Sequence, residues 1–450
     1  MTGWINKLLS RIRSGRSGHG QNGHNPICLE TIENAIGRDN QKVRAPAPAG
    51  HPRIILYIGQ LGPGGAERQL CYTAAGLHGR GYDVTVLTTS RPSGELGYYL
   101  PYLKEHGVPA HSARSAPLEK LITRKNTLPG IDFDVLQAVP ANLFDQVAAL
   151  VNELLTIEPG ILHCWLDHSN IIGGLAGFIT GVPGIFLGCR NMNPTNFPFY
   201  EPWLDPWYKT LMKSSRVVML NNSRAGAEDY ARWLGASPST FHVIYNGLDF
   251  GTLRVPPKNE VRTFRTSIGA HDKPLIGGIF RIGPEKRPFD FLSVIDRVQE
   301  RIGTVRAVIA GTGILENEVG KFIRSHGLED TVKLLGVRSD IYTVIRACDL
   351  ILHTSENDGN PNALMEAQYL GVPVVATRAG GTPEILSDGV SALLHPVGDI
   401  EGLASSAVSI LSDRTKAAHL AEAGHRLMKE KFSLDRMIDD MIQLYSGVIR

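Results

Sequence analysis

The sequence contains little cysteine and almost no excess of charge of one sign. Its five cysteines among 450 residues are an odd number and form no C-x-x-C pair. A disulfide framework or a zinc knuckle is therefore not expected, and a reducing compartment is favoured. Lys and Arg number 46 and Asp and Glu 44, which leaves a net charge of +2. This balance argues against a nucleic-acid-binding protein, because such proteins usually carry a basic excess.

Long apolar runs are also scarce. Residues 171–189 carry no charge over nearly the length of a membrane span, but glycines and Pro183 interrupt them. We expect a helix near 170–180, a turn, and a buried strand near 184–188. No cleavable signal peptide is visible, because basic residues interrupt the apolar positions near the start. A cytoplasmic protein is expected.

Residues 1–50 differ in composition from the rest. Apolar residues between Trp4 and Ile12 recur at helical spacing among basic residues. This pattern indicates a short amphipathic helix able to lie on an anionic membrane surface, such as the inner membrane. A disordered tail with chance periodicity explains it equally well. Residues 14–50 are rich in Gly, Ser, Asn, Pro and Arg, so a flexible linker is expected there.

From residue 53 onward, apolar runs suited to buried strands alternate with helical stretches, and the alternation restarts after Asn246-Gly247. Such alternation predicts parallel sheets with crossover helices. We expect an α/β fold of two facing Rossmann-like, doubly wound domains, at residues 51–250 and 251–432, with a last helix at 433–450 packing back on the first. Ligands of such sheets bind at the carboxyl ends of the strands, so the site is expected in the interdomain cleft.

A glycine-rich turn, Gly62-Pro63-Gly64-Gly65-Ala66-Glu67, follows the first expected strand. Its glycines let the backbone approach a ligand, and the helix start offers N–H groups to an anion. A dinucleotide-binding fold usually has an acidic residue at the end of the second strand. Here Arg91 follows that strand and could receive a 2′-phosphate, so an NADP-dependent oxidoreductase is an alternative.

Arg281 and Lys286 follow the strand that opens the second half. A bidentate guanidinium and a compact ammonium group can converge on one diphosphate. A solvated basic loop is the ordinary alternative.

The most specific motif is the segment 355–367. Asn360 is expected to cap a helix whose first residue is Pro361. The free amides of the helix start would then attract a phosphate; they belong to Asn362, Ala363 and Leu364.

Two carboxylates flank this helix start. Asp358 precedes it, and Glu366 lies about 7–8 Å further along the helix axis. They can hold hydroxyl groups on either side of a diphosphate, which is the shape of a nucleotide-sugar. A capping Asp and a buried structural Glu are the alternative.

Together with GVPVVATRAGGTPEIL at 371–386, these motifs resemble the retaining glycosyltransferases of family four, which have the GT-B fold. The resemblance covers roughly residues 53–450 and is stronger in the second half. It implies transfer of a hexose from a nucleotide diphosphate sugar, a UDP-sugar by default, to a glycan or lipid-linked acceptor in bacterial polysaccharide biosynthesis. A nucleotide-sugar epimerase or hydrolase of the same fold and a membrane scaffold are alternatives.

The resemblance also implies roles for individual residues. Glu366 would bind the ribose, Arg281 and Lys286 the diphosphate, and the Gly336-Val337-Arg338 loop the base. Gly64 and Gly65 would touch phosphate or acceptor. Asp358, next to Gly359, stands where the family has a glutamate, so its role toward the hexose is a hypothesis.

In the first half, residues 162–170 resemble a family stretch with a strand-end histidine. Trp165 stands where many relatives have histidine, so the catalytic role falls on His168, and His163 is expected to orient the loop. A structural histidine is the alternative. Arg190 is a candidate contact for an anionic acceptor.

Two further features bear on the site. Residues 197–208 are rich in aromatic side chains, which suits an acceptor-side or membrane-facing surface, or packing beneath a long loop. Asp132-Phe133-Asp134 is a D-x-D pattern, but no His, Cys or carboxylate cluster supports it. We expect neither a metal site nor a cofactor, since basic groups and a helix dipole can neutralise a departing diphosphate.

Overall fold

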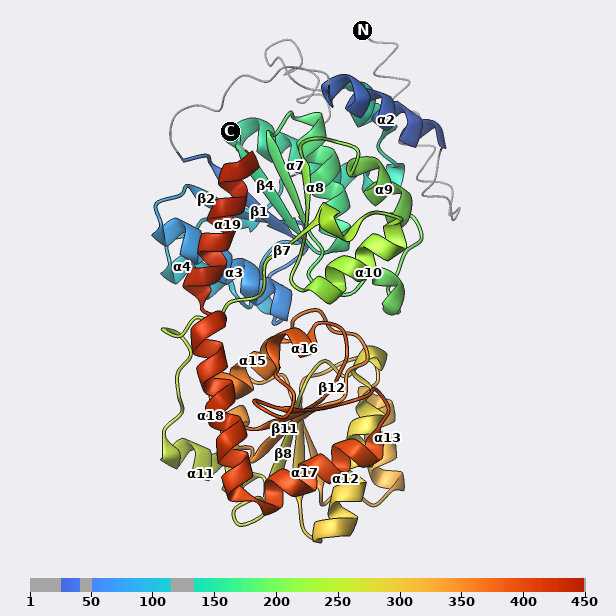
Figure 1. Cartoon of the computed structure of the whole chain (residues 1–450). Coiled ribbons are helices and arrows are strands. Elements are labelled where there is room, and N and C mark those ends of the chain that lie inside the picture. Colours follow the sequence, from blue (N-terminus) through green and yellow to red (C-terminus); the bar gives the residue numbers. More distant parts are fainter. Residues whose placement is uncertain (1–25, 41–50, 115–132, 449–450) are drawn as a thin grey trace.

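The computed structural model describes residues 26–40, 51–114 and 133–448, and within these it contains two parallel sheets (Figure 1). The seven-stranded sheet has the order β3-β2-β1-β4-β5-β6-β7, and the six-stranded sheet has the order β10-β9-β8-β11-β12-β13. Every strand pair is parallel. The prediction of two doubly wound α/β units is therefore confirmed. The amphipathic helix predicted between Trp4 and Ile12 lies outside the described residues.

The strands of the first half are β1 (Ile54–Ile58), β2 (Val84–Thr88), β3 (Ala110–Ser112), β4 (Ile161–Trp165), β5 (Gly184–Gly188), β6 (Val217–Asn221) and β7 (Phe241–Val243). Those of the second half are β8 (Leu275–Ile279), β9 (Arg306–Ala310), β10 (Val332–Gly336), β11 (Leu350–His353), β12 (Val374–Thr377) and β13 (Leu393–His395). Most are short apolar runs with both faces buried, as expected when helices cover both sides of a parallel sheet.

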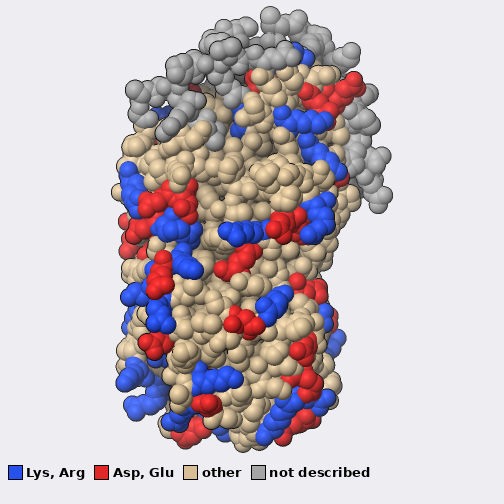
Figure 2. Space-filling view, viewed as in Figure 1, with Lys and Arg blue, Asp and Glu red and all other residues tan. Residues whose placement is uncertain are grey.

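The helices around the first sheet are α3 (Gly65–Gly79), α4 (Leu100–Glu105), α6 (Phe133–Ala138), α7 (Ala141–Ile157), α8 (Asp167–Ile179), α9 (Leu204–Leu211) and α10 (Arg224–Leu234). Those around the second are α11 (Lys258–Ser267), α12 (Pro288–Ile302), α13 (Glu316–Ser325), α14 (Ile341–Ala347), α15 (Asn362–Tyr369), α16 (Thr382–Ile385), α17 (Ile400–Ser412) and α18 (Arg414–Lys431). On the face shown in Figure 2, basic and acidic side chains are interspersed, in keeping with the balanced composition.

The apolar stretch at 171–189 divides as predicted. α8 ends at Ile179, Gly181 turns the chain with a φ of 74°, and β5 begins at Gly184. No helix in the described part of the chain has the length and apolar character needed to cross a membrane.

The linker prediction for residues 14–50 is wrong for α2 (Pro26–Asn40). Ile32, Ala35 and Ile36 are buried on one face of α2, and the helix packs against α6 and α9. The Asp39 carboxylate pairs with Arg216 at 2.8 Å. α2 was not recognised from the sequence, because the segments on both sides of its short apolar face have the composition of a flexible linker.

The last helix, α19 (Leu434–Val448), completes the core of the first half. Leu248 exchanges backbone hydrogen bonds with Phe432 and Leu434, each 2.8 Å long, where the chain returns to the first half. α19 then lies along α3 (Figure 1). Met441 and Tyr445 are buried among residues of the first sheet, and the Tyr445 hydroxyl shares a 2.7 Å hydrogen bond with His163 Nδ1.

Because α19 fills part of this core, Met441→Ala is expected to destabilise the protein by about 2–5 kcal/mol through a cavity. Gln443→Ala, on the exposed side of the same helix, should change stability by less than about 0.5 kcal/mol. Thermal unfolding of both variants checks this. Equal midpoints for both would show that α19 does not stabilise the first half.

Candidate active site

The carboxyl ends of the two sheets meet at the junction of the halves. α3 follows β1, and α15 follows β11, so each helix begins at the carboxyl end of its own sheet. A Cβ placed on Gly65 would lie only 2.9 Å from Nδ2 of Asn362. Two helix N-termini, each favourable for an anion, therefore face each other across the junction.

A buried polar network centred on Asn246 joins the halves. The Asn246 amide donates to Asn360 O at 3.0 Å and to Asn362 Oδ1 at 2.8 Å. Gln69 of α3 donates to the same Asn362 oxygen at 3.2 Å and to Gly247 O at 2.9 Å. This network sets the relative position of α3 and α15.

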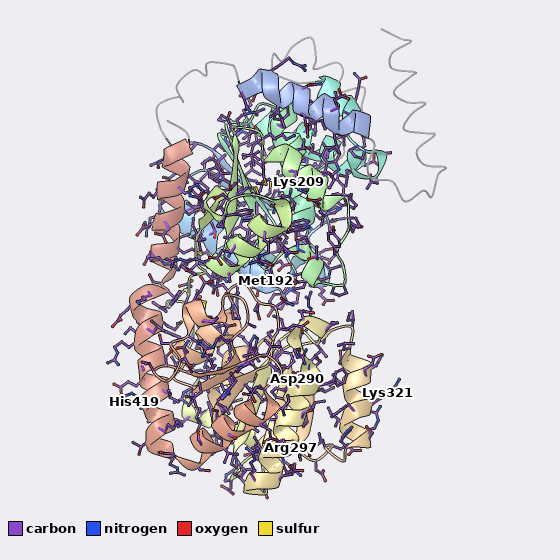
Figure 3. The ribbon with its side chains drawn as sticks, turned by 45° about the vertical axis from the view of Figure 1, so that its right-hand side comes forward. Met192, Lys209, Asp290, Arg297, Lys321 and His419 are labelled. Carbon is purple, nitrogen blue, oxygen red and sulfur yellow. The ribbon has the colours of Figure 1, made fainter. Side chains whose placement is uncertain are left out.

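Beside this network, glycines without a Cβ allow the backbones of the two halves to pack closely. Any Cβ on Gly359 would lie 2.5 Å from Asn222 Oδ1. The backbone at Gly359, within the motif at 355–367, therefore packs directly on the loop that follows β6. Gly380 contacts the backbone of Asp358, and a Cβ there would lie 3.1 Å from Met192 Sδ of the first half. Figure 3 shows Met192 at the end of the first half that faces the second.

Lys286 and Asp358, both predicted from the sequence, form a pair. Lys286 Nζ lies 2.6 Å from Asp358 Oδ2. The same oxygen accepts from His353 Nε2 at 2.9 Å and from Ser355 Oγ at 3.1 Å. The three donors therefore orient the carboxylate through Oδ2.

The pKa of Asp358 shows which effect dominates. Burial by itself raises this pKa, but the charge of Lys286 and the hydrogen bond from His353 outweigh it and hold the pKa well below its usual range. Asp358 is thus a carboxylate at neutral pH. His353 was missed by the sequence analysis; its place at the end of β11 was the available signal.

Arg281 lies in the same loop as Lys286, the loop that follows β8, but pairs with a different residue. Its guanidinium pairs with Glu285 at 2.6 Å and lies 5.4 Å from the centre of the Phe199 ring. About half of the Arg281 side chain (52 %) is exposed, so it is accessible to a ligand. The sequence predicts that Arg281 and Lys286 converge on one diphosphate; in the structure they hold two separate carboxylates.

Glu366 is almost fully buried, with 4 % of its side chain exposed, and pairs with Arg68 of α3. Burial raises the pKa of Glu366, and the positive charge of Arg68 partly opposes this. Arg68 was missed by the sequence analysis, although it follows Glu67 directly in the glycine-rich motif. No local pattern pairs residues so far apart in the chain.

The start of α15 differs from the prediction in two ways. α15 begins at Asn362, with Pro361 as the capping residue, and the Asn360 side chain donates to Asn222 O at 3.1 Å instead of capping the helix. The N–H of Leu364 donates to Pro361 O at 3.1 Å, so it is not a free amide. The amides of Asn362 and Ala363 remain the candidates for phosphate binding.

At the start of α3, Gly64 is the capping residue, and the Glu67 side chain folds back against it. Burial raises the pKa of Glu67, while nearby Arg281 lowers it. In the predicted base loop after β10, Val337 is 49 % exposed and Arg338 pairs with Asp340 at 2.7 Å.

His168 lies at the start of α8, accessible to solvent, with its ring edge-to-face against Trp203 at 5.6 Å. Partial burial lowers its pKa below 6.5, although Glu201 opposes the shift. The sequence predicts that His163 orients this loop. In the structure its ring is instead buried and shares a hydrogen bond with the Tyr445 hydroxyl. Burial lowers its pKa to about 3.

Arg190 does not present an open guanidinium to an acceptor. It is buried, donates to Asn246 Oδ1, and lies 4.1 Å from the centre of the Trp165 ring. Burial lowers its pKa to about 9. Its contacts tie it to the network between the halves.

The aromatic segment at 197–208 divides between the two interpretations. Trp207 is buried in the core of the first half, whereas Phe199 is 57 % exposed beside Arg281. Among the described residues no cluster of His, Cys or carboxylates could hold a metal ion. Asp132 of the D-x-D pattern lies outside the described residues.

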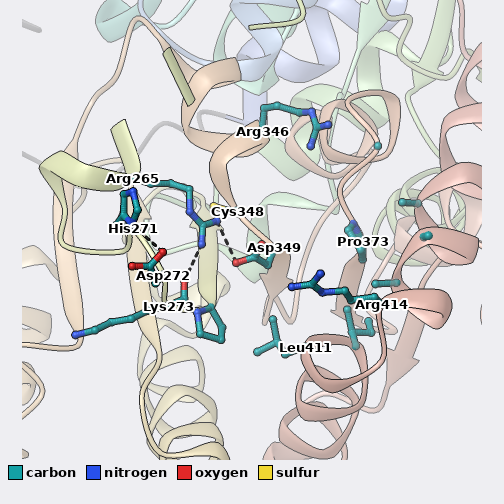
Figure 4. Close-up of a pocket in the computed structure, with 16 residues that line it drawn as sticks. Arg265, His271, Asp272, Lys273, Arg346, Cys348, Asp349, Pro373, Leu411 and Arg414 are labelled. Atoms are coloured by element: carbon teal, nitrogen blue, oxygen red, sulfur yellow. Dashed lines mark hydrogen bonds and ion pairs between the residues drawn. The ribbon is translucent and has the colours of Figure 1, made fainter. Parts of the chain in front are cut away.

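A cavity of about 590 Å³ opens in the second half, away from these residues (Figure 4). Pro274, Asp349 and Pro373, which line it, each come just before a strand of the second sheet. The predicted site residues follow strands, so the cavity lies at the opposite edge of the sheet.

Comparison with known proteins agrees with this geometry. Residues 63–251 match the family described as Glycosyltransferase Family 4, and residues 261–427 match Glycosyl transferases group 1. The chain is 25 % identical to the Vi polysaccharide biosynthesis protein VipC/TviE of Salmonella typhi, over 98 % of this chain and 79 % of that protein. It is 24 % identical to the D-inositol 3-phosphate glycosyltransferase of Mycolicibacterium paratuberculosis, over 95 % of this chain and 96 % of that protein.

Solved structures share the fold. HepE of Anabaena, in complex with UDP-glucose, superposes with a TM-score of 0.70 at 24 % identity, covering 88 % of this chain and 100 % of that one. Sucrose-phosphate synthase of Thermosynechococcus elongatus gives a TM-score of 0.67 at 16 % identity, with 88 % and 98 % covered. With a family model matching each half and two facing parallel sheets, the chain belongs to the GT-B glycosyltransferases and is a transferase enzyme.

Proposed function

We propose that the protein is a retaining glycosyltransferase that transfers a hexose from a UDP-sugar to a hydroxyl of a glycan or lipid-linked acceptor in polysaccharide biosynthesis. The observation that carries the proposal is the pair of buried carboxylates, Asp358 and Glu366, on either side of the α15 N-terminus and opposite the start of α3. The UDP-glucose complex of HepE and the Vi polysaccharide relative support the donor and the pathway class.

In this proposal each carboxylate accepts hydrogen bonds from one end of the donor. Asp358 is held through Oδ2, so Oδ1 is the oxygen offered to hexose hydroxyls. Glu366 would receive the ribose hydroxyls. The diphosphate would lie between them, against the N-termini of α15 and α3, where the helix dipoles favour negative charge.

The difficult step is the departure of the diphosphate while the sugar becomes oxocarbenium-like. Lys286, Arg281 and the amides of Asn362 and Ala363 would stabilise the charge that develops on the leaving group. We propose that the leaving phosphate assists attack of the acceptor hydroxyl on the same face, which retains the anomeric configuration. His168 would orient that hydroxyl from the first half.

The acceptor would approach past Phe199 and Trp203, whose rings suit stacking on a sugar. Among the described residues Cys71, Cys164, Cys189 and Cys348 form no disulfide bond, which agrees with a cytoplasmic enzyme. We propose that any contact with the inner membrane is peripheral.

A thermal-shift panel of nucleotide-sugars tests the donor assignment. A ligand present at 100 times its Kd stabilises the folded protein by about 2.7 kcal/mol. UDP and UDP-hexoses are expected to raise the unfolding midpoint, and ADP-sugars are not. A shift with GDP-sugars alone would refute the UDP assignment, and a shift with NADP alone would refute the glycosyl donor.

Replacing the diphosphate cation tests the chemistry. Lys286→Ala should lower turnover of the donor about a hundredfold or more, because one electrostatic contact to the leaving group is lost. Lys321→Ala, on the exposed face of α13 (Figure 3), is the matched control and should keep normal turnover. Release of nucleoside diphosphate measures both, and near-normal turnover of Lys286→Ala would contradict the assignment.

The pH profile tests His168. The pKa of Asp358 is held well below its usual range, so this group stays ionised, whereas partial burial lowers the pKa of His168 from its ordinary value, so this group is neutral at pH 7. Protonation of His168 should therefore lower kcat/KM as the pH falls below about 6.5. His168→Gln should reduce the rate at pH 7 and remove this acid limb. An unchanged limb in the variant would exclude His168 as its origin.

A further inference from the structure

Arg68 connects the first half of the molecule to the residue that would hold the donor ribose. It lies in the first turns of α3, and its Nη2 pairs with Oε1 of Glu366 on α15. Only 15 % of the Arg68 side chain and 4 % of the Glu366 side chain are exposed. This is a buried ion pair between residues nearly 300 positions apart, in the two different halves.

The pair joins Nη2 of Arg68 to Oε1 of Glu366. No hydrogen bond from the described residues to Oε2 of Glu366 is found. A buried carboxylate that lost its cation would be strongly disfavoured as an anion. Arg68 therefore supplies the charge that lets Glu366 remain a strong hydrogen-bond acceptor in this position.

The surroundings of Arg68 keep its guanidinium group charged. Burial by itself lowers the pKa of Arg68, but the charge of Glu366 outweighs it and raises this pKa, with smaller contributions from Tyr99, Tyr342 and Tyr72. Arg68 thus remains charged at every relevant pH. The backbone of the same residue is fixed by its N–H, which donates to Gly64 O at 3.1 Å.

We propose that Arg68 is a positioning residue for nucleotide binding: it orients Glu366 through Oε1 so that Oε2 accepts from the ribose hydroxyls. The inference rests on the proposed ribose role of Glu366. It makes the ribose pocket a composite of both halves, so that nucleotide affinity depends on α3 as well as on the second sheet.

Two other roles for Arg68 would change nucleotide affinity in a different way when the residue is removed. If Arg68 blocked the ribose position, its removal would strengthen nucleotide binding. If Arg68 contacted the diphosphate directly, its removal would weaken the binding of nucleotides with and without ribose hydroxyls to the same degree.

Calorimetric titration with UDP and with 2′,3′-dideoxy-UDP separates these roles. The wild-type protein should prefer UDP by about tenfold or more, the effect of a hydrogen bond to a charged group. Arg68→Met should lose about tenfold in UDP affinity and most of the preference over the dideoxy ligand. Arg68→Lys, which keeps the charge, should retain part of both.

Two controls complete the experiment. Arg80→Met removes an exposed arginine that follows α3, pairs with Asp435 and Asp439, and should leave both affinities unchanged. In a Glu366→Gln background, Arg68→Met should cause little further loss of UDP affinity, because the two residues act together. Thermal unfolding of each variant shows that it is folded.

Tighter UDP binding by Arg68→Met, or equal losses for UDP and the dideoxy ligand, would overturn the inference. UDP binding by the wild-type protein with no change in either Arg68 variant would overturn it while leaving the proposed function intact. A wild-type protein that binds neither ligand would overturn both.

Discussion

The Asn246 side chain is the point on which the geometry of the site depends. Its amide nitrogen donates to the loop and helix start of the second half, and its oxygen accepts from Arg190 of the first half. Its backbone oxygen accepts from Arg436 of α19 at 2.8 Å. One buried residue thus joins both sheets and the returning helix. Since buried polar groups are costly when unpaired, this network holds the two helix N-termini face to face.

That constraint explains why the site carboxylates have the partners they do. With α3 and α15 opposed, Arg68 reaches Glu366, while Lys286 reaches Asp358 within the second half. Each carboxylate is buried and each has a cation, which is the condition under which a buried charge is tolerated. These contacts engage Oε1 of Glu366 and Oδ2 of Asp358, and in the proposed function the other oxygen of each carboxylate accepts from donor hydroxyls.

The two pairs differ in their electrostatic balance. The partners of Asp358 lower its pKa despite burial, whereas Arg68 only partly offsets the burial of Glu366. The donor-hexose end of the proposed site is therefore firmly anionic, and the ribose end depends more on its single cation. The short side chain of Asp358 is held in this position by Lys286, His353 and Ser355.

Most of the fold could be predicted from local patterns. Apolar runs marked the strands. The sequence Gly-Val-Pro occurs at 107–109, 181–183 and 371–373, and each of these glycines adopts the left-handed backbone that ends a helix. The ends of those strands then indicated Lys286, Asp358 and Glu366. The short helix α2 was not predictable in the same way, because its apolar face is small and its flanks are rich in glycine and serine.

Spacing along the chain could not indicate partners across the junction. Arg68 with Glu366, Asn246 with Asn362, and His163 with Tyr445 each join residues more than 100 positions apart. The residues next to Arg190 in the sequence do not indicate that it is buried and not exposed to a ligand. Likewise, the sequence around Asn360 does not indicate that its side chain donates to Asn222 O and does not cap a helix. Local sequence patterns thus indicate which residues belong to the site, whereas the pairing of those residues follows from long-range packing. The reason is that burial and distance are properties of the folded chain alone.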